Sequence, residues 1–210
     1  MLYVIFDTET TGRKPETNDV IQIAYMVLDD DRNVIDADSV YLNTDLIIEQ
    51  GAYNVHHIDK AFLEENAGSY FLSDFIMSNP YFNGEVEDIT YIAYNAYFDI
   101  TSINTSLVRR GYPLVKFGSE VKSLNQTSGR HNLCLMKYSQ RYLGRSRWPK
   151  LSDARQCVLG EDCENIIQDF IKQICGVFNI DIKKDSAAHD ALYDTAVTAF
   201  LFNVYKEQER

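Results

Sequence analysis

Four acidic residues and one histidine stand where the sequence could build a metal-dependent hydrolytic site, and Asp7 and Glu9 are the first pair. They lie two residues apart after an apolar run, so on a strand their carboxylates would point to one face. Two carboxylates on one face repel each other unless a cation lies between them, and hard oxygen ligands suit Mg²⁺ or Mn²⁺. The alternative is a pair of solvated acids at a strand end. Thr10, Thr11 and Gly12 favour the metal site, because they predict a tight turn with hydroxyls and free backbone N–H groups.

The other candidates are Asp99, Asp194 and His189. Asp99 opens a predicted helix, where the alternative is a first-turn acid that favours the helix dipole. Five residues of a helix turn through about 140°, so His189 and Asp194 meet only if His189 lies in the loop before the helix. Asp194 would then project from the second turn, where an acid among apolar neighbours is costly unless it is paired or metal-bound. The alternative for His189 is a helix-entry histidine without a function.

The elements that must position these residues follow from hydrophobic periodicity. We predict strands at 2–7, 20–29, 33–42 and 89–94, with a hairpin turn at 29–33 that makes the first three an antiparallel meander. We predict helices at 99–110, 133–143, 151–159, 164–178 and 190–206, two short helical pieces in 59–78, and a loop at 112–130. This order favours an α/β fold, with a mixed sheet and helices on both faces.

Length and composition set the class of protein. A chain of 210 residues with 45% apolar residues can fold as one domain with a full core. No run of 18 apolar residues is present, and the N-terminus lacks the basic start and cleavage site of a signal peptide, so we expect a cytoplasmic protein. The four cysteines show no C-x-x-C spacing, which predicts reduced thiols rather than a zinc site.

The net charge of −11 opposes phosphate binding by overall attraction, but the charge is uneven. Residues 130–155 hold seven basic residues and one acid, a net +6, which leaves −17 for the rest of the chain. With Tyr142 and Trp148 among the bases, this basic window predicts a surface for the backbone and bases of a nucleic acid. The alternative is a solvated helix face that happens to be basic.

Taken together, three motifs resemble the DEDD superfamily of exonucleases in its histidine subclass. They are Phe6-Asp7-Thr8-Glu9-Thr10-Thr11-Gly12, Asn95-Ala96-Tyr97-Phe98-Asp99 and His189-x-Ala191-x-x-Asp194. The tyrosine subclass would carry Tyr at the position of Asp190. Val55-His56-His57-Ile58 is similar to a family loop that touches the terminal nucleotide, with His57 in place of Gly, which predicts a different backbone shape there.

The resemblance implies a ribonuclease H-like fold, a five-stranded mixed sheet flanked by helices, within a single exonuclease domain at 1–210 that has a divergent helical insertion around 112–186. It implies that Asp7, Glu9, Asp99 and Asp194 hold two Mg²⁺ or Mn²⁺ ions and that His189 is a general base. The predicted substrate contacts are Thr8, Thr10, Thr11, Gly12, Val55, His56, Asn95 and Phe98, together with Arg145 and Arg147 of the basic window.

The implied activity is 3′→5′ removal of nucleoside 5′-monophosphates from single-stranded or frayed ends of DNA or RNA. The alternatives are an RNA exonuclease similar to ribonuclease T or oligoribonuclease, and a non-catalytic nucleic-acid-binding subunit of a replication or repair assembly. Tyr94 stands where many relatives have His, and Leu135 where they often have Thr, so the substrate preference stays open.

Overall fold

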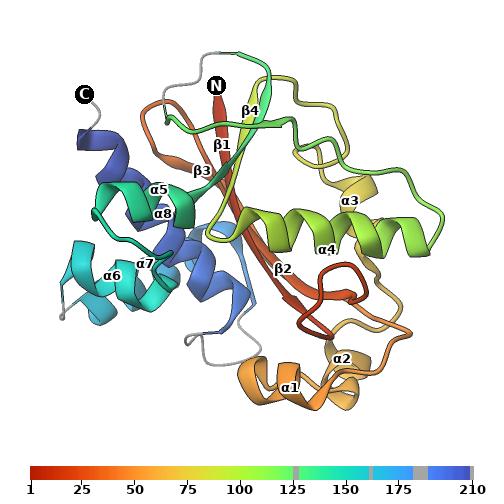
Figure 1. Cartoon of the computed structure of the whole chain (residues 1–210). Coiled ribbons are helices and arrows are strands. Elements are labelled where there is room, and N and C mark those ends of the chain that lie inside the picture. Colours follow the sequence, from red (N-terminus) through yellow and green to blue (C-terminus); the bar gives the residue numbers. More distant parts are fainter. Residues whose placement is uncertain (125–127, 161–162, 182–188, 209–210) are drawn as a thin grey trace.

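In the computed structural model, residues 1–124, 128–160, 163–181 and 189–208 are described. They form a six-stranded mixed sheet between helical layers (Figure 1). The strands are β1 (Leu2–Thr10), β2 (Val20–Leu28), β3 (Val34–Tyr41), β4 (Ile89–Ala93), β5 (Ser119–Glu120) and β6 (Arg130–Cys134). Their order is β3-β2-β1-β4-β6-β5; β1, β2 and β3 are antiparallel neighbours, whereas β4, β6 and β5 extend the sheet in parallel. The predicted α/β class and the antiparallel meander are therefore confirmed.

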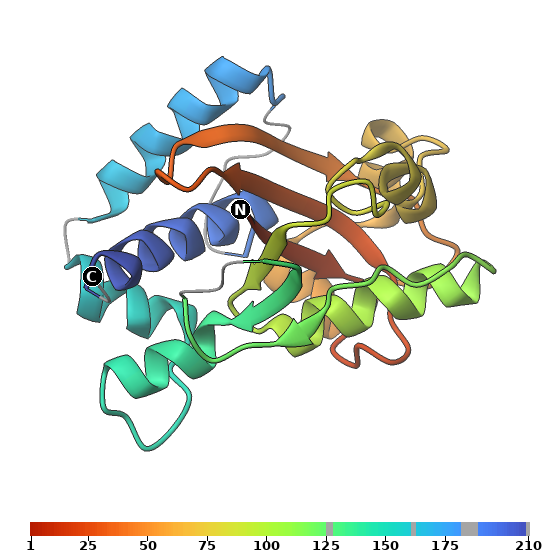
Figure 2. The same ribbon diagram turned by 90° about the horizontal axis from the view of Figure 1, so that it is seen from above.

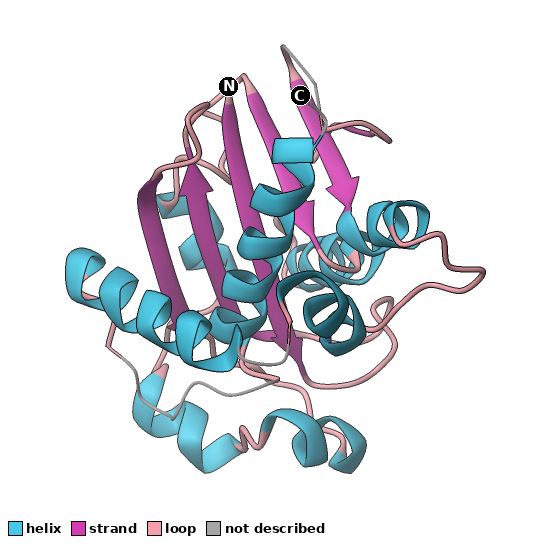
Figure 3. Ribbon diagram, turned by 90° about the vertical axis from the view of Figure 1, so that its left-hand side faces the viewer, coloured by secondary structure: helices cyan, strands magenta, loops and turns pink. Residues whose placement is uncertain are grey.

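The helices cover both faces of this sheet (Figure 2). They are α1 (Gln50–His56), α2 (Lys60–Asn66), α3 (Leu72–Ser78), α4 (Ala96–Arg109), α5 (Leu135–Tyr142), α6 (Leu151–Leu159), α7 (Cys163–Phe178) and α8 (Ala191–Gln208). Helix α8 packs on β1 and β2 and also contacts α5, α6 and α7, and most of its residues are buried. Figure 3 shows the helical layer on this face of the sheet. Helices α3 and α4 lie on the opposite face.

Strand β1 is the centre of the fold because both of its faces are buried. Tyr3 and Ile5 belong to the core on the α8 side, whereas Val4 and Phe6 belong to the core on the α4 side. Since side chains alternate along a strand, Asp7 and Glu9 continue the row of Tyr3 and Ile5 and face α8. The apolar run thus fixes which face receives the two acids.

The hairpin between β2 and β3 forms at the predicted polar turn. Asp29 accepts a 2.8 Å hydrogen bond from the Asn33 backbone, and the Asp29 N–H donates to the Asn33 carbonyl at 3.1 Å. Arg32 completes the turn with a left-handed φ of 69°. The turn chemistry therefore specified this connection locally.

Three element predictions were wrong in detail. Residues 130–134 form β6, and helix α5 begins only at Leu135, whereas we predicted one helix over 133–143. Only Leu133 and Cys134 of β6 are fully buried, so its sequence carries little strand signal and pairing with β4 defines it. The two-residue β5 makes the sheet six-stranded rather than five-stranded, and α1 was not predicted.

Among the described residues, no helix is both long and apolar enough to span a lipid bilayer.

Candidate active site

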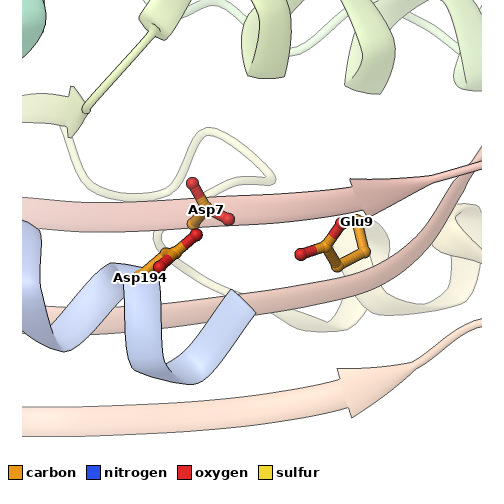
Figure 4. Close-up of side chains that lie close together, drawn as sticks. All are labelled: Asp7, Glu9 and Asp194. Atoms are coloured by element: carbon orange, nitrogen blue, oxygen red, sulfur yellow. The ribbon is translucent and has the colours of Figure 1, made fainter. Parts of the chain in front are cut away.

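Asp7, Glu9 and Asp194 lie together where β1 meets the first turn of α8 (Figure 4). One carboxylate oxygen from each lies within 4.8 Å of the others, and all three side chains are partly exposed. We refer to these three residues as the carboxylate cluster. Asp194 projects from the first turn of α8 rather than from the predicted second turn, because the helix begins at Ala191. Since α8 packs on the face of β1 that carries Asp7 and Glu9, acids 185 or more residues apart in sequence converge.

Asp99 reaches the same region from α4, on the other side of the sheet. Its side chain is only 3% exposed. One of its oxygens accepts two hydrogen bonds from Thr8, from the backbone N–H at 3.1 Å and from the hydroxyl at 2.7 Å. Asp99 is thus held against the residue that lies between Asp7 and Glu9.

The mutual repulsion of these acids is visible in their pKa values. Desolvation raises the pKa of Asp7 well above its usual range, and the charges of Asp99, Asp194, Glu9 and Asp190 raise it further. Desolvation also raises the pKa of Asp99 to about 7, although the hydrogen bonds from Thr8 oppose the shift. Because the charged form of these carboxylates is disfavoured in the metal-free protein, a bound cation would stabilise that form strongly.

Asp194 shows the same behaviour. Desolvation raises its pKa to about 7, and the charge of Asp190 adds to the shift. A hydrogen bond from the His189 backbone and the charge of Arg155 act in the opposite direction. Carboxylates with raised pKa values in a recess are a recognised mark of a functional site.

His189 lies in the turn directly before α8, as the sequence predicted. Its side chain is exposed and its φ of 68° is left-handed, which is uncommon for a residue with a β-carbon. Asp190 then caps α8, accepting hydrogen bonds from the backbones of Leu192 and Tyr193 at 3.0 and 3.4 Å. Gln22 of β2 donates to Asp190 at 3.1 Å and so fixes the entrance of the helix to the sheet.

Six predicted site residues line one cavity of about 280 Å³, which we call the nucleotide cavity. They are Glu9, Thr10, Gly12, Val55, His56 and Phe98, and Arg13, Gly51 and Ala52 complete the wall. The structure therefore brings the first motif, the second motif and the Val55–Ile58 loop together beside the carboxylate cluster.

Three of the groups expected to be free in the turn after Glu9 are hydrogen-bonded within the protein: the hydroxyls of Thr10 and Thr11 and the Thr11 N–H. The Thr10 hydroxyl donates to the Gly12 carbonyl at 2.8 Å. The Thr11 hydroxyl accepts from the Asp19 backbone at 2.9 Å, and the Thr11 N–H donates to the Asp19 carbonyl at 2.9 Å. These hydrogen bonds shape the turn.

His56 is similarly engaged. It is 2% exposed; its Nδ1 accepts from the Ile58 backbone at 3.0 Å and its Nε2 donates to the Thr10 carbonyl at 3.1 Å. The next residue, His57, has a φ of 56°, a conformation that glycine adopts readily. The histidine thus adopts a left-handed backbone conformation at this position, and whether the loop differs in shape from that of relatives stays a prediction. Asn95 is exposed at the start of α4 and does not line the nucleotide cavity.

The basic window is not one continuous free surface. Arg130, Arg141 and Arg155 donate to groups of the protein, and Lys137 pairs with Glu120. Tyr142 packs on Tyr205 in the core, so only Trp148, which is 59% exposed, is available for stacking. Arg145 and Arg147 are exposed in the loop between α5 and α6; Arg145 contacts the Cys157 sulfur at 3.0 Å.

Sequence reasoning missed three residues that organise the site: Asp190, Tyr94 and Arg155. Tyr94 directly follows β4 and donates to the carbonyls of Pro149 and Lys150, at 2.9 and 3.1 Å. Arg155 of α6 bonds Glu164 and the Tyr193 hydroxyl. Apart from Glu164, which lies nine residues from Arg155, the partners that place these residues are 38 or more residues away, so local patterns do not reveal them. The unusual Tyr94 before the second motif was a signal.

A mixed sheet with two acids on its central strand, a third from the C-terminal helix and a fourth from the helix after β4 defines a ribonuclease H-like nuclease site. Residues 4–122 match a family model described as "Exonuclease", RNase_T. The chain therefore belongs to this exonuclease family, in the DEDD superfamily.

Solved structures support the fold. The chain superimposes on Escherichia coli exonuclease I in complex with a dT13 oligonucleotide, with a TM-score of 0.63 and 20% identity, over 100% of this chain and 42% of that one. For exonuclease X in complex with 5′ overhanging duplex DNA, the TM-score is 0.56 at 20% identity, over 99% and 93%. For an ExoI/SSB-Ct complex, the TM-score is 0.60 at 18% sequence identity, and the match covers 99% of this chain and 42% of that one. The chain spans less than half the length of the exonuclease I chains. The comparison with curated proteins gives no match.

Proposed function

We propose that this protein is a metal-dependent 3′→5′ exonuclease that releases nucleoside 5′-monophosphates. The observation that carries the proposal is the carboxylate cluster, with oxygens of Asp7, Glu9 and Asp194 within 4.8 Å and with the pKa values of Asp7 and Asp194 raised. Membership of the exonuclease family supports the same class of reaction.

The donor set fits divalent ions. Carboxylate oxygens are hard ligands, which Mg²⁺ and Mn²⁺ prefer. Desolvation, and after it the neighbouring charges, raise the pKa values of Asp7 and Asp194, and a cation would stabilise their charged forms against both. Asp7, Glu9 and Asp194 would hold the ions, with Asp99 beside them under its hydrogen bonds from Thr8. When bound, two such ions lower the pKa of a water and offset charge on the phosphodiester.

The remaining chemistry belongs to residues of the chain. His189 accepts the proton of the attacking water from its exposed position before α8. The nucleotide cavity receives the terminal nucleotide, because Val55 and Phe98 offer apolar surface there and Glu9 joins the cavity to the cluster. His56 and Asp190, which are buried and hydrogen-bonded, keep the walls in place.

The neighbouring structures, which contain DNA, favour DNA as the substrate. Exonuclease I is seen with an oligothymidylate and exonuclease X with overhanging duplex DNA, so we propose single-stranded or frayed 3′ ends as the substrate. The ExoI/SSB-Ct complex supports a replication or repair protein as a partner. We propose cytoplasmic action by a single exonuclease domain over 1–210, with 112–186 as its divergent part.

Digestion of matched DNA and RNA oligonucleotides, labelled at either end, tests the function. We expect stepwise shortening from the 3′ end that needs Mg²⁺ or Mn²⁺ and stops in EDTA. Faster loss of RNA would favour the alternative similar to ribonuclease T or oligoribonuclease. Binding without any cleavage would favour the non-catalytic subunit, and release from the 5′ end would contradict the proposed direction.

A further inference from the structure

A second cavity, of about 370 Å³, opens beside His189. Its lining includes Lys150, Ser152 and Arg155 from the start of α6, and His189 and Asp194 from the start of α8. Glu9 lines the nucleotide cavity and Asp194 lines this one, so the carboxylate cluster lies between the two cavities. We call the second one the α6 cavity.

The α6 cavity is rich in groups that bind anions. Lys150 is exposed, and its side-chain ammonium forms no hydrogen bond or ion pair with the residues that the structure describes. Ser152 adds a hydroxyl, and as the N-cap of a nine-residue helix Lys150 stands beside backbone N–H groups that no side chain caps. Lys150 and Arg155, together with these donors, thus place positive charge at one cavity of a protein whose net charge is −11.

Arg155 is held in place rather than free to move. It bonds Glu164 of α7 and the hydroxyl of Tyr193 on α8, which fixes its guanidinium between three helices. Its Nε is buried and has no hydrogen-bond partner in the part of the chain that the structure describes. The arginine therefore presents a fixed positive charge, which already acts on Asp194.

The backbone at the rim of the α6 cavity is also fixed. The Tyr94 hydroxyl donates to the carbonyls of Pro149 and Lys150, at 2.9 and 3.1 Å. Tyr94 directly follows β4 and precedes Asn95 and Asp99, so the position of Lys150 is tied to the same strand end as Asp99. A preformed cationic wall loses little conformational entropy on binding.

We propose that the α6 cavity binds a phosphate group of the substrate strand while the terminal nucleotide occupies the nucleotide cavity. This inference rests on the proposed function. Its physical reason is that a carboxylate cluster repels the phosphates on either side of the scissile bond, and Lys150 and Arg155 offset that repulsion next to Asp194. A strand that lies across the cluster from one cavity to the other is held on both sides of the reacting bond.

The test pairs one side-chain change with one change in the strand. We compare wild type, Lys150→Gln and the control Lys172→Gln, which removes an exposed charge on α7. The probes are single-stranded deoxyoligonucleotides in which each of the last three linkages in turn is an uncharged methylphosphonate. Dissociation constants are measured with Ca²⁺ in place of Mg²⁺, and intact oligonucleotide is recovered afterwards to show that binding was read without cleavage.

We expect Lys150→Gln to raise the Kd about ten-fold, as for a lost hydrogen bond to a charged group, and Lys172→Gln to leave it unchanged. The slope of log affinity against log salt should fall by about 0.7, the value for one contact on a single strand. At one of the three linkages, the methylphosphonate should weaken binding to the wild-type protein by the same factor. It should not weaken binding to Lys150→Gln any further, because both changes remove the same contact.

Two results would overturn the proposal. One is that the losses of affinity caused by Lys150→Gln and by the methylphosphonate add together at every linkage, which would mean that Lys150 contacts no particular phosphate. The other is a Kd for the strand that does not change, even if the affinity for a nucleoside 5′-monophosphate falls, because the cavity would then serve the product alone. Failure of the proposed function is seen separately, as absence of cleavage by wild type with Mg²⁺ or Mn²⁺.

Discussion

Thr8 directs both of its hydrogen-bond donors to the same oxygen of Asp99, the backbone N–H at 3.1 Å and the hydroxyl at 2.7 Å. Thr8 stands between Asp7 and Glu9 on β1, so this contact joins the acid of α4 to the strand that carries two other acids. With both donors bonded to Asp99, Thr8 positions that carboxylate, and its predicted contact with substrate stays a prediction.

Thr8→Val should therefore lower stability by removing the hydroxyl and keeping the shape. Hydrogen bonds to charged groups contribute about 1.5–3 kcal/mol, and we expect a loss of that size in the free energy of unfolding by urea at pH 8. Thr90→Val is the matched control, since Thr90 is a buried strand threonine whose hydroxyl contacts only the Met1 sulfur, at 3.9 Å. Equal losses in the two variants would contradict the role of Thr8.

Asp7→Asn should separate activity from stability. Without divalent ions, Asp7 is disfavoured in its charged form by desolvation and by its acidic neighbours, so the neutral amide should raise the melting temperature in EDTA. The same change should abolish cleavage and the rise in melting temperature on adding Mg²⁺ or Mn²⁺. Asp169→Asn, on the exposed surface of α7, controls for the loss of one charge. A lower melting temperature for Asp7→Asn in EDTA would refute this explanation.

The stability of the metal-free protein should fall as pH rises. The folded pKa values of Asp99 and Asp194 are about 7, above the usual 3.8, so between these values the folded chain holds protons that the unfolded chain has released. Their contribution is present in full below pH 3.8 and is lost as pH rises through 7. Urea unfolding in EDTA from pH 5 to 8 measures this fall. Asp99→Asn should flatten the fall, and added Mn²⁺ should reverse it; a flat wild-type profile would contradict the raised pKa values.

The sequence predicted what local patterns encode. The apolar run before Asp7, the hairpin at Asp29 and the placement of His189 before the last helix all follow from neighbours along the chain, and the structure has each of them. The packing of α8 on β1 is a long-range contact, which local patterns do not predict. The convergence of the acids could therefore be predicted only from the resemblance of the three motifs to the family.

What the sequence could not predict depends on distant partners. The hydroxyls of Thr10 and Thr11 are bonded within the turn that ends at Asp19, and Tyr142, which is partly buried, packs on Tyr205, more than 60 residues away. Strand β6 exists because β4 offers it a partner, not because its residues favour a strand. Such outcomes are decided by tertiary packing.

The loop between α5 and α6 should contribute to binding through Trp148 and Arg147. Trp148→Ala should weaken binding of a single strand by about 1–3 kcal/mol, the usual value for one base stacked on an aromatic ring.

Arg145→Glu with Arg147→Glu should raise KM and flatten the salt dependence. Tyr142→Phe is the control, because Tyr142 packs in the core. An unchanged salt slope would mean that this part of the basic window is only a solvated face.

His189 is the residue whose change tests the mechanism most directly. A general base contributes about 10²–10⁴-fold to the rate, so kcat should fall by that factor when the imidazole is removed. Because His189 has a left-handed φ of 68°, alanine would add backbone strain, whereas His189→Asn and His189→Gly accept this conformation.

Both variants should keep the carboxylate cluster, so half-saturation by Mn²⁺ in a binding titration should stay within about two-fold of wild type. The side chain is exposed, so the free energy of unfolding should change by no more than about 0.5 kcal/mol. If either variant keeps near-normal kcat at saturating metal, His189 is not the base, and the exonuclease must draw the proton from its water in another way.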